Sequence, residues 1–200
     1  MRTIFSEKHA LHSGIHEIVD DKLVPSFESP DRATLVLEAV VAAGLGDVVP
    51  PEGFDSGPLE RVHDRRYLEF LETAWDQWTA AGRSGNARPF AWAVRGMRQE
   101  EPEHIDGKLG YYSSDVDSSI TPGTWQAARS AADVALTGAT QLLDGQRAAF
   151  SLCRPPGHHA SADYFGGYCF LNNAAIAAQF LLDNGAGRVA ILDVDYHHGN

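Results

Sequence analysis

The chain has 200 residues, enough for one large domain or two small ones, and folding could bury roughly 70% of its extended-chain surface. Its 16 Lys and Arg against 27 Asp and Glu give a net charge of -11, which disfavours direct nucleic-acid binding and favours cationic ligands. We find neither an apolar stretch of the roughly 20 residues that span a bilayer nor a secretory signal, and expect a cytoplasmic protein. The two cysteines, Cys153 and Cys169, are too few for a disulfide framework and are expected to be reduced thiols near a core.

The first third of the chain predicts a strand and a helix. Residues 3–5 form a short apolar run typical of an edge strand, and a polar, histidine-bearing loop follows as far as Ser29. Ser29 can serve as the N-cap, with Pro30 at the first helical position, of a helix that ends at Gly44.

The middle third predicts an amphipathic helix and a long insertion. Apolar residues recur every three or four positions between 64 and 81, with Trp75 and Trp78 facing a core. Residues 82–112 mix Gly, Pro and charge without periodicity and are interpreted as an insertion loop within a single domain. Loops this long are usually functional or disordered.

The last third alternates helices with short apolar strands. We expect a helix capped by Thr124 and running to residue 143, a buried strand at 148–152, a loop at 151–168, a helix at 170–184 and a hydrophobic strand at 188–194. This alternation predicts an α/β fold with a mainly parallel sheet.

Acids and a histidine end the predicted last strand. Residues two apart on a strand point to the same side about 6.6 Å apart, so Asp193, Asp195 and His197 share one face. Asp195 and His197 can converge on one zinc ion if the chain turns between them, whereas Asp193 is better placed to support a ligand or bind a different cation. A lone Asp-x-His is more often a solvated strand end, but acids that end a buried hydrophobic strand favour metal.

Two adjacent histidines, His158 and His159, lie in a loop stiffened by proline and glycine. Imidazole titrates near neutral pH, which suits acid-base chemistry. Such a pair in isolation is more often plain surface, but its predicted position at the same sheet end as Asp195 favours a catalytic role. Further along, Gly167 and Tyr168 could line a narrow slot for an alkyl chain, although this pattern also fits an ordinary loop-to-helix junction.

Three motifs together carry a family resemblance. They are PGHHA at 156–160, GYCFLNN at 167–173 and DVDYHHGN at 193–200. In order, spacing and identity they resemble the zinc-dependent deacetylases of the arginase/histone-deacetylase superfamily, and similar stretches at 63–68 and 109–111 extend the likeness over most of the chain. The first seven residues and the insertion look most like the acetylpolyamine amidohydrolase branch. The resemblance implies a three-layer α/β sandwich with a mainly parallel sheet.

The resemblance also implies a metal centre. Asp195 and His197 would be ligands of one zinc ion, and Asp193 would bind a structural potassium ion while supporting His158. In the family an Asp supplies the third zinc ligand and a Tyr stabilises the oxyanion, both well downstream of residue 200. We therefore expect these 200 residues to be part of a longer protein, with a sheet that is incomplete at its carboxyl-terminal side.

The remaining roles implied by the resemblance concern catalysis. His159 would be the general base and then the general acid, with His158 as its electrostatic partner. Asn200 stands where many relatives have an Asp that orients the second histidine, and Gly167 and Tyr168 would line the substrate tunnel.

The resemblance also bears on how the substrate is attracted and on whether the protein forms a dimer. Asp106 and Asp117 match positions where the family places carboxylates that attract a cationic polyamine, although solvated surface acids are an equally good interpretation. The family's insertion packs against a second subunit, so the resemblance implies a homodimer.

The leading prediction is an enzyme that hydrolyses the acetamide of N-acetylated polyamines or other small acetylated amines. An acetyl-lysine deacetylase shares every motif from residue 156 onward, but the insertion would narrow access for a protein substrate. An arginase-like ureohydrolase would need more acids around the metal strand. A non-catalytic metal-binding fragment remains open because only two ligands are present. His9, His12 and His16 are interpreted as a polar loop near the site entrance with nothing to orient their rings.

Overall fold

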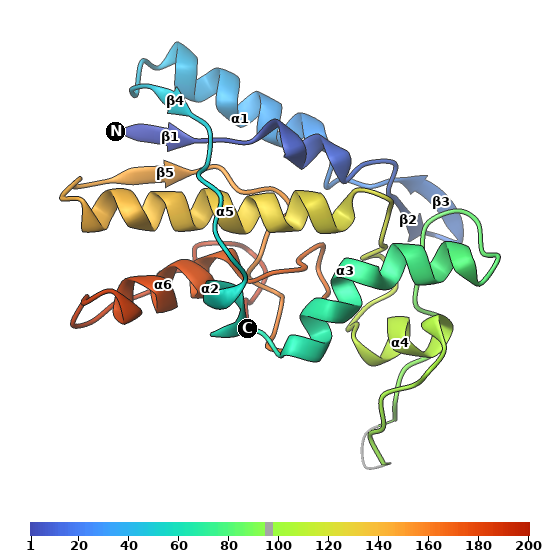
Figure 1. Cartoon of the computed structure of the whole chain (residues 1–200). Coiled ribbons are helices and arrows are strands. Elements are labelled where there is room, and N and C mark those ends of the chain that lie inside the picture. Colours follow the sequence, from blue (N-terminus) through green and yellow to red (C-terminus); the bar gives the residue numbers. More distant parts are fainter. Residues whose placement is uncertain (95–97) are drawn as a thin grey trace.

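The computed structural model describes residues 1–94 and 98–200, so residues 95–97 of the predicted insertion lie outside the described part of the chain. Three short strands, β1 (Arg2–Ile4), β4 (Val48–Val49) and β5 (Ala149–Ser151), form a parallel sheet in the order β4-β1-β5. Figure 1 shows helices on both sides of these strands, with α1 above and α5 below. The α/β class with a parallel sheet is therefore confirmed.

Two strand predictions are corrected by this sheet. The strand predicted at residues 3–5 is central rather than at an edge, because Thr3 pairs with Val48 on one side and with Phe150 on the other. The strand predicted at 188–194 is not part of the described sheet, and Leu192 and Val194 are 87% and 86% exposed. A strand needs a hydrogen-bonded neighbour, and an apolar run by itself does not supply one.

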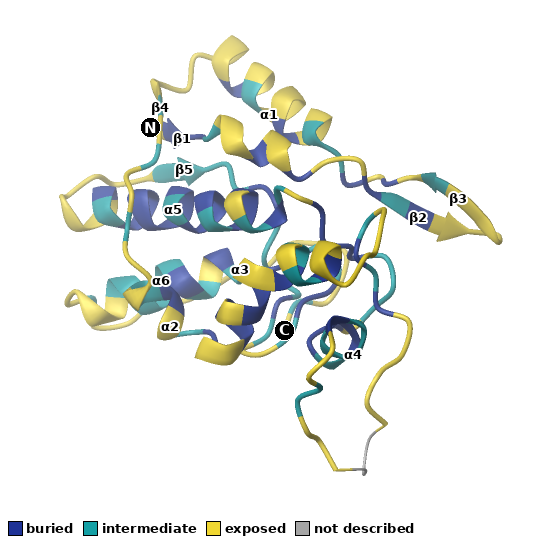
Figure 2. Ribbon diagram, turned by 45° about the vertical axis from the view of Figure 1, so that its right-hand side comes forward, coloured by how far each residue is buried: buried dark blue, intermediate teal, exposed yellow. Residues whose placement is uncertain are grey.

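The predicted polar loop before Ser29 is also wrong in part. It contains a 3-10 turn, η1 (Glu7–Leu11), and an antiparallel hairpin of β2 (His16–Val19) and β3 (Lys22–Pro25). Asp20 and Asp21 both have positive φ, 49° and 61°, which a two-residue hairpin turn requires. The hairpin is the projecting, largely exposed ribbon of Figure 2.

Six helices complete the described fold. They are α1 (Pro30–Ala42), α2 (Gly57–Glu60), α3 (Arg65–Ala80), α4 (Ile105–Tyr111), α5 (Thr124–Leu143) and α6 (Asn173–Asp183). The predicted helices at 30–44, 64–81, 124–143 and 170–184 are confirmed within a few residues at each end. The cap of α5 is Gly123 rather than Thr124, because the Thr124 hydroxyl accepts the backbone N–H of Thr121 instead of an N–H inside the helix.

The fourth helix lies inside the segment predicted to be an irregular loop. His104 caps α4 by accepting the backbone N–H of Asp106, and Ile105 and Leu109 are buried one turn apart. That apolar pair was the signal for a helix, but seven residues give too little periodicity to stand out.

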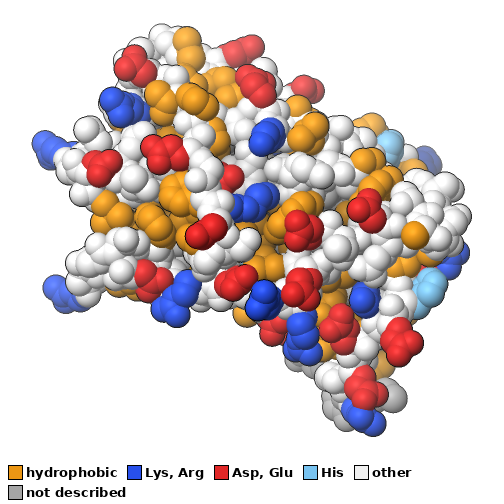
Figure 3. All heavy atoms as spheres, in the orientation of Figure 1, with side chains coloured by type: hydrophobic (Ala, Val, Ile, Leu, Met, Phe, Trp, Pro, Cys, Tyr) orange, Lys and Arg blue, Asp and Glu red, His pale blue; other side chains and the backbone are white. Residues whose placement is uncertain are grey.

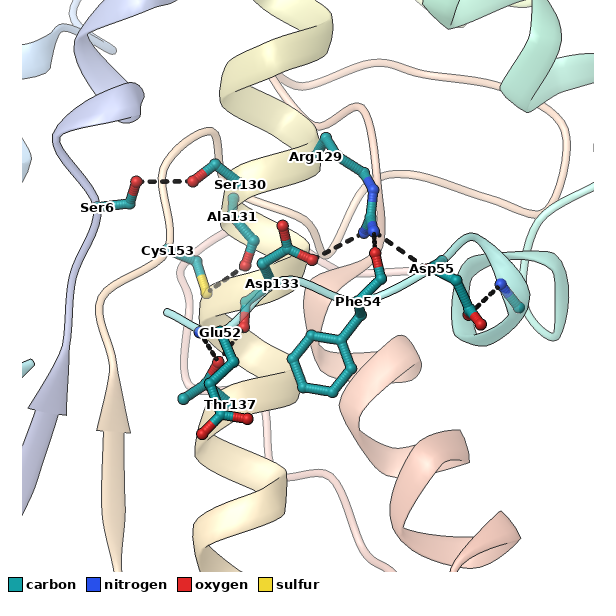
Figure 4. Close-up of polar contacts among 11 residues, drawn as sticks. Ser6, Glu52, Phe54, Asp55, Arg129, Ser130, Ala131, Asp133, Thr137 and Cys153 are labelled. Carbon is teal, nitrogen blue, oxygen red and sulfur yellow. Dashed lines mark hydrogen bonds and ion pairs between the residues drawn. The ribbon is translucent and has the colours of Figure 1, made fainter. Parts of the chain in front are cut away.

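Helix α5 ties together segments that are distant in sequence (Figure 4). Arg129 pairs with Asp133 one turn along the helix at 2.9 Å and donates to the carbonyl oxygen of Phe54. Thr137 accepts the backbone N–H of Glu52 at 2.9 Å. The connection from β4 to α2 is thus fixed along α5.

The same helix also holds the chain shortly after β1 and shortly after β5. Ser130 donates to the hydroxyl of Ser6 at 2.7 Å, and the Cys153 thiol donates to the carbonyl of Ala131 at 3.3 Å. Because Cys153 directly follows β5, this contact sets the direction in which the chain leaves the sheet.

The hydrophobic core lies between α3, α4, α5 and α6, whose inward faces are the dark segments of Figure 2. Trp78 is 5% exposed in this core, and Trp75 packs against it while partly buried. Among the described residues, none of the helices has both the length and the apolar character needed to cross a bilayer.

Candidate active site

A cavity of about 960 Å³ opens where the loops after β5 meet the carboxyl-terminal segment. Its lining includes most of the predicted site residues, namely His158, His159, Gly167, Tyr168, Asp193, Asp195 and His197. Three motifs that are separated in sequence therefore meet at one place, beyond the carboxyl end of β5, where ligand sites of parallel sheets are usually found.

Asp195 and His197 bring two metal-donor atoms together. Nδ1 of His197 lies 3.3 Å from Oδ2 of Asp195. Two donors about 2.0 to 2.1 Å from a tetrahedral ion are roughly 3.3 to 3.4 Å apart, so the observed spacing fits one zinc ion. Among the residues that the structure describes, no group of three or more His, Cys, Asp and Glu side chains gathers at a metal position.

The backbone prepares Asp195 for this role. Its Oδ2 accepts the backbone N–H of His197 at 2.8 Å, which fixes the turn between the two donors. This bond is the main reason that the pKa of Asp195 lies below its ordinary value. The carboxylate is therefore ionised at neutral pH, as a metal ligand must be.

Asp193 faces His158 instead. Oδ2 of Asp193 lies 2.9 Å from Nδ1 of His158, and Oδ1 accepts the backbone N–H of Asp195 at 3.1 Å. The backbone bond and then the bond to His158 lower the pKa of Asp193. An ionised Asp193 keeps the proton of neutral His158 on Nδ1 and leaves Nε2 as its basic nitrogen.

His159 lies between the other two imidazoles. Its ring centroid is 4.0 Å from that of His158 and 6.2 Å from that of His197. Desolvation lowers the pKa of His159, and positive charge on His158 or His197 lowers it further. His159 is therefore mainly neutral at pH 7 and can accept a proton.

Asn200 fixes the backbone of the two histidines. Its backbone N–H donates to the carbonyl of His158 at 2.8 Å, and its side-chain amide donates to the carbonyl of His159 and to the Tyr164 hydroxyl. The resemblance implied an influence on the second imidazole, and the structure places the contact on the peptide carbonyl of that residue.

Gly167 and Tyr168 form one wall of the cavity through an unusual backbone conformation. Both have positive φ, 52° and 65°, which is uncommon for tyrosine. A Cβ on Gly167 would lie 2.1 Å from the His159 ring, so only glycine leaves room for that imidazole.

The Tyr168 wall is acidic. Burial raises the pKa of Tyr168, and a hydrogen bond to Glu17 and the nearby charges of Asp117 and Asp115 raise it further. Glu17 belongs to the β2–β3 hairpin, which was not predicted, so its approach to Tyr168 was not foreseeable from spacing in sequence.

The two acids predicted to attract substrate lie in different surroundings. Asp117 is near Tyr168 and accepts the backbone N–H of Ile18 at 3.4 Å. Asp106 pairs with Arg83 and lies 3.5 Å from the His104 ring. Neither acid is among the residues that line the cavity.

The loop that carries His158 and His159 is anchored by His63 and Tyr67, to which the sequence analysis assigned no role. Buried His63 lies 2.8 Å from the Ser161 carbonyl through Nδ1 and accepts the backbone N–H of Asn172 through Nε2 at 3.0 Å. The buried Tyr67 hydroxyl donates to the Phe170 carbonyl at 2.6 Å. The middle and the carboxyl end of the loop that carries His158 and Tyr168 are thus held by His63 and Tyr67.

The early histidines are not a loose polar loop as predicted. His12 is 1% exposed, its Nδ1 lies 2.8 Å from the Thr124 hydroxyl, and burial lowers its pKa to about 3. His9 is buried as well, and its carbonyl accepts from Arg154, which forms a buried two-bond ion pair with Glu28. His12 is therefore oriented by the fold, which the sequence could not indicate because Thr124 is 112 positions away.

Both cysteines are free thiols, as expected. Burial raises the pKa of Cys153 and of Cys169 to about 12. The two thiols stay protonated at neutral pH and do not suit zinc ligation.

A family model and several relatives match this chain. The model of the histone deacetylase domain matches residues 26–200. The chain belongs to the histone deacetylase family. It is 58% identical over 200 residues to acetylpolyamine amidohydrolase 2 of Pseudomonas aeruginosa and 53% identical over 200 residues to acetylpolyamine amidohydrolase of Mycoplana ramosa. These alignments cover all of this chain but only 58% and 59% of the two relatives.

A solved structure gives the same result for the fold. The crystal structure of acetylpolyamine aminohydrolase from Burkholderia pseudomallei superposes with a TM-score of 0.84 at 34% identity, covering 92% of this chain and 53% of the other. The chain thus has the α/β deacetylase fold and spans less than two thirds of its histone deacetylase family relatives.

Proposed function

We propose that this chain is the metal-binding part of a zinc-dependent amidohydrolase that removes the acetyl group from N-acetylated polyamines or other small acetylated amines. The observation that carries the proposal is the meeting of Asp195, His197 and the two adjacent histidines in one cavity. Its similarity to acetylpolyamine amidohydrolases over its full length supports the same activity.

Asp195 and His197 would hold the zinc ion. The 3.3 Å between their donor atoms suits the metal, and the third ligand that a catalytic zinc needs is not gathered with them among the described residues. When bound, zinc would supply Lewis-acid activation of the amide carbonyl and of the attacking water. Asp193, beside His158, is proposed to bind a structural potassium ion.

The two histidines divide the proton chemistry. Neutral His159 accepts the proton of the attacking water and then delivers it to the departing amine. His158 directs its Nδ1–H at the Asp193 carboxylate, and this contact fixes the orientation of the ring. The negative carboxylate also stabilises positive charge on the pair of adjacent histidines. Gly167 holds the slot beside His159 open to a slim alkyl chain.

A specific observation favours cationic amines over protein substrates. Glu17, Asp115 and Asp117 all act on Tyr168 at the cavity wall, so negative charge gathers where the amine tail of a polyamine would lie. The net charge of -11 alone does not show this, because Asp and Glu are interspersed with Lys and Arg on the face drawn in Figure 3.

The experiment is acetate release by the complete, zinc-loaded protein. We expect a higher kcat/KM for N-acetylputrescine and acetylspermidine than for an acetyl-lysine peptide of the same overall charge. A higher kcat/KM for the peptide would support the acetyl-lysine alternative. Release of no acetate from any of the acetamides, with zinc bound, would support the non-catalytic alternative.

We also propose a homodimer built on the insertion. Phe90 and Val94 of this segment are 74% and 62% exposed, and Figure 1 shows the described parts of the loop before α4 extending away from the rest of the molecule. Sedimentation of the complete protein and of Phe90→Ser would test it, since the substitution should shift the equilibrium toward monomer.

A further inference from the structure

One carboxylate joins the loop before α5 to the cavity wall. Oδ2 of Asp115 accepts the backbone N–H of Gly167 at 2.5 Å and the Ser118 hydroxyl at 3.0 Å. The Ser118 oxygen in turn accepts the backbone N–H of Tyr168 at 2.8 Å. Two consecutive N–H groups of the wall are thus bonded to Asp115, one directly and one through Ser118.

Asp115 is itself held in place. Its Oδ1 accepts the backbone N–H groups of Asp117 and Ser118 at 2.9 and 2.7 Å, so the carboxylate closes a turn of its own loop. Arg88 secures that loop from the other side by donating to the Val116 carbonyl at 3.0 Å. A side chain on Gly166 would collide with the side chains of Ser114 and Asp115, so the backbone of the wall lies directly against them.

The segment that Asp115 holds is the one against which His159 rests. Left-handed backbone at a tyrosine is strained and persists only where the surroundings enforce it. The His159 ring packs on the Gly167 backbone with no room for a methyl group. A shift of that backbone would therefore move the imidazole.

We propose that Asp115, acting through Ser118, is a positioning residue that locks Gly167 and Tyr168 in the left-handed conformation and so sets the position of His159. The proposal rests on the proposed function in that His159 is taken as the base. Both oxygens of Asp115 are bonded within the two loops, so this positioning role is separate from the negative charge that Asp115 adds near Tyr168.

The test compares three variants of the complete zinc-loaded protein with N-acetylputrescine as substrate. Asp115→Asn should lower kcat about 10- to 100-fold, since a misplacement near 1 Å can cost that much, with KM within about twofold and zinc content unchanged. Ser118→Ala should lower kcat about 2- to 10-fold, as expected for one hydrogen bond. Combined, the two changes should cost less than the product of their separate effects, because they break one network.

Ser119→Ala is the matched control. Ser119 is as buried as Ser118 and adjacent to it, but its hydroxyl contacts no hydrogen-bond partner in the described structure, so its loss should leave kcat unchanged. Equal losses in Ser118→Ala and Ser119→Ala would overturn the proposal. A second result would also overturn it: Asp115→Asn with an unchanged kcat and a KM that rises at low salt but not at high salt. That result would mean that Asp115 contacts the substrate directly through its charge.

A second readout is independent of activity. In the metal-free protein, amide hydrogen exchange at Gly167 and Tyr168 should be faster in Asp115→Asn than in the parent, while exchange in α5 should not change. Unchanged exchange at both amides overturns the role of Asp115 even if the parent enzyme is active. A parent protein that releases no acetate overturns the proposed function, and exchange still decides whether Asp115 holds the wall.

Discussion

The two halves of the candidate site are built in different ways. The loop that carries His158 and Tyr168 is held at its middle and its carboxyl end by buried His63 and Tyr67, and Phe165 and Cys169 within it are fully buried. The segment that carries Asp195 and His197 has side chains 49% and 71% exposed. Among the described residues, the segment of Asp195 and His197 therefore makes fewer contacts with other elements than the histidine loop does.

The physical reason lies in the partners of each half. The histidine loop is bonded to α3 and to the loop of Asp115, whereas the metal segment is ordered mainly by bonds between its own residues and to the two histidines.

The largest expected effect is on the metal half. Asp195→Ala or His197→Ala in the complete protein should weaken zinc binding more than 10²-fold, because changes even to outer-shell partners cost 10- to 100-fold. Metal content after dialysis, measured by mass spectrometry, checks this. Retention of one zinc equivalent in both variants would refute the ligand assignment.

The next largest effect is expected from removing the proposed base, His159, on the histidine loop. His159→Ala should lower kcat about 10²- to 10⁴-fold and leave zinc bound, since a general base contributes that much and is not a ligand. Steady-state kinetics and metal analysis of the same preparation separate the two effects. Loss of zinc together with activity would mean that His159 takes part in metal binding.

A pair of Tyr→Phe changes compares the support of the two halves directly. Tyr67→Phe removes a buried 2.6 Å bond to the Phe170 carbonyl and should lower the free energy of unfolding by about 1 to 3 kcal/mol. Tyr196→Phe changes a side chain that is 96% exposed and should leave it unchanged within about 0.5 kcal/mol. Urea unfolding of both proteins gives the answer, and equal losses would remove the contrast between the halves.

The smallest effect concerns charge at the wall. Asp117→Asn should raise KM for acetylpolyamines about 2- to 5-fold at low salt, the range of an exposed ion pair, and the difference should shrink as salt screens the remaining field. Kinetics at two ionic strengths test this. The polyamine proposal fails if KM is unchanged at low salt, and the deacetylase family assignment is unaffected.

The sequence led us to expect the candidate site residues close together, while parts of the fold around them were not predicted. The motifs placed His158, His159, Asp195 and His197 together because strand ends of a parallel sheet meet at one edge, and the cavity brings them together. Helices α1, α3, α5 and α6 followed from caps and periodicity. Helix α4 and the β2–β3 hairpin were missed, since seven-residue and four-residue elements carry little periodic signal.

Sequence by itself determined the family and the α/β class, because these depend on motif identity and on local periodicity, and the same motifs carry the prediction of a zinc site. Only the tertiary structure decided which residues support that chemistry. Asp115 meets Gly167, His63 meets Asn172 and His12 meets Thr124 across separations of 52, 109 and 112 positions. Contacts of that kind depend on how helices and loops pack, and no local pattern encodes the partner. The unpaired segment at 188–194 has the same cause, since a strand exists only beside a neighbour.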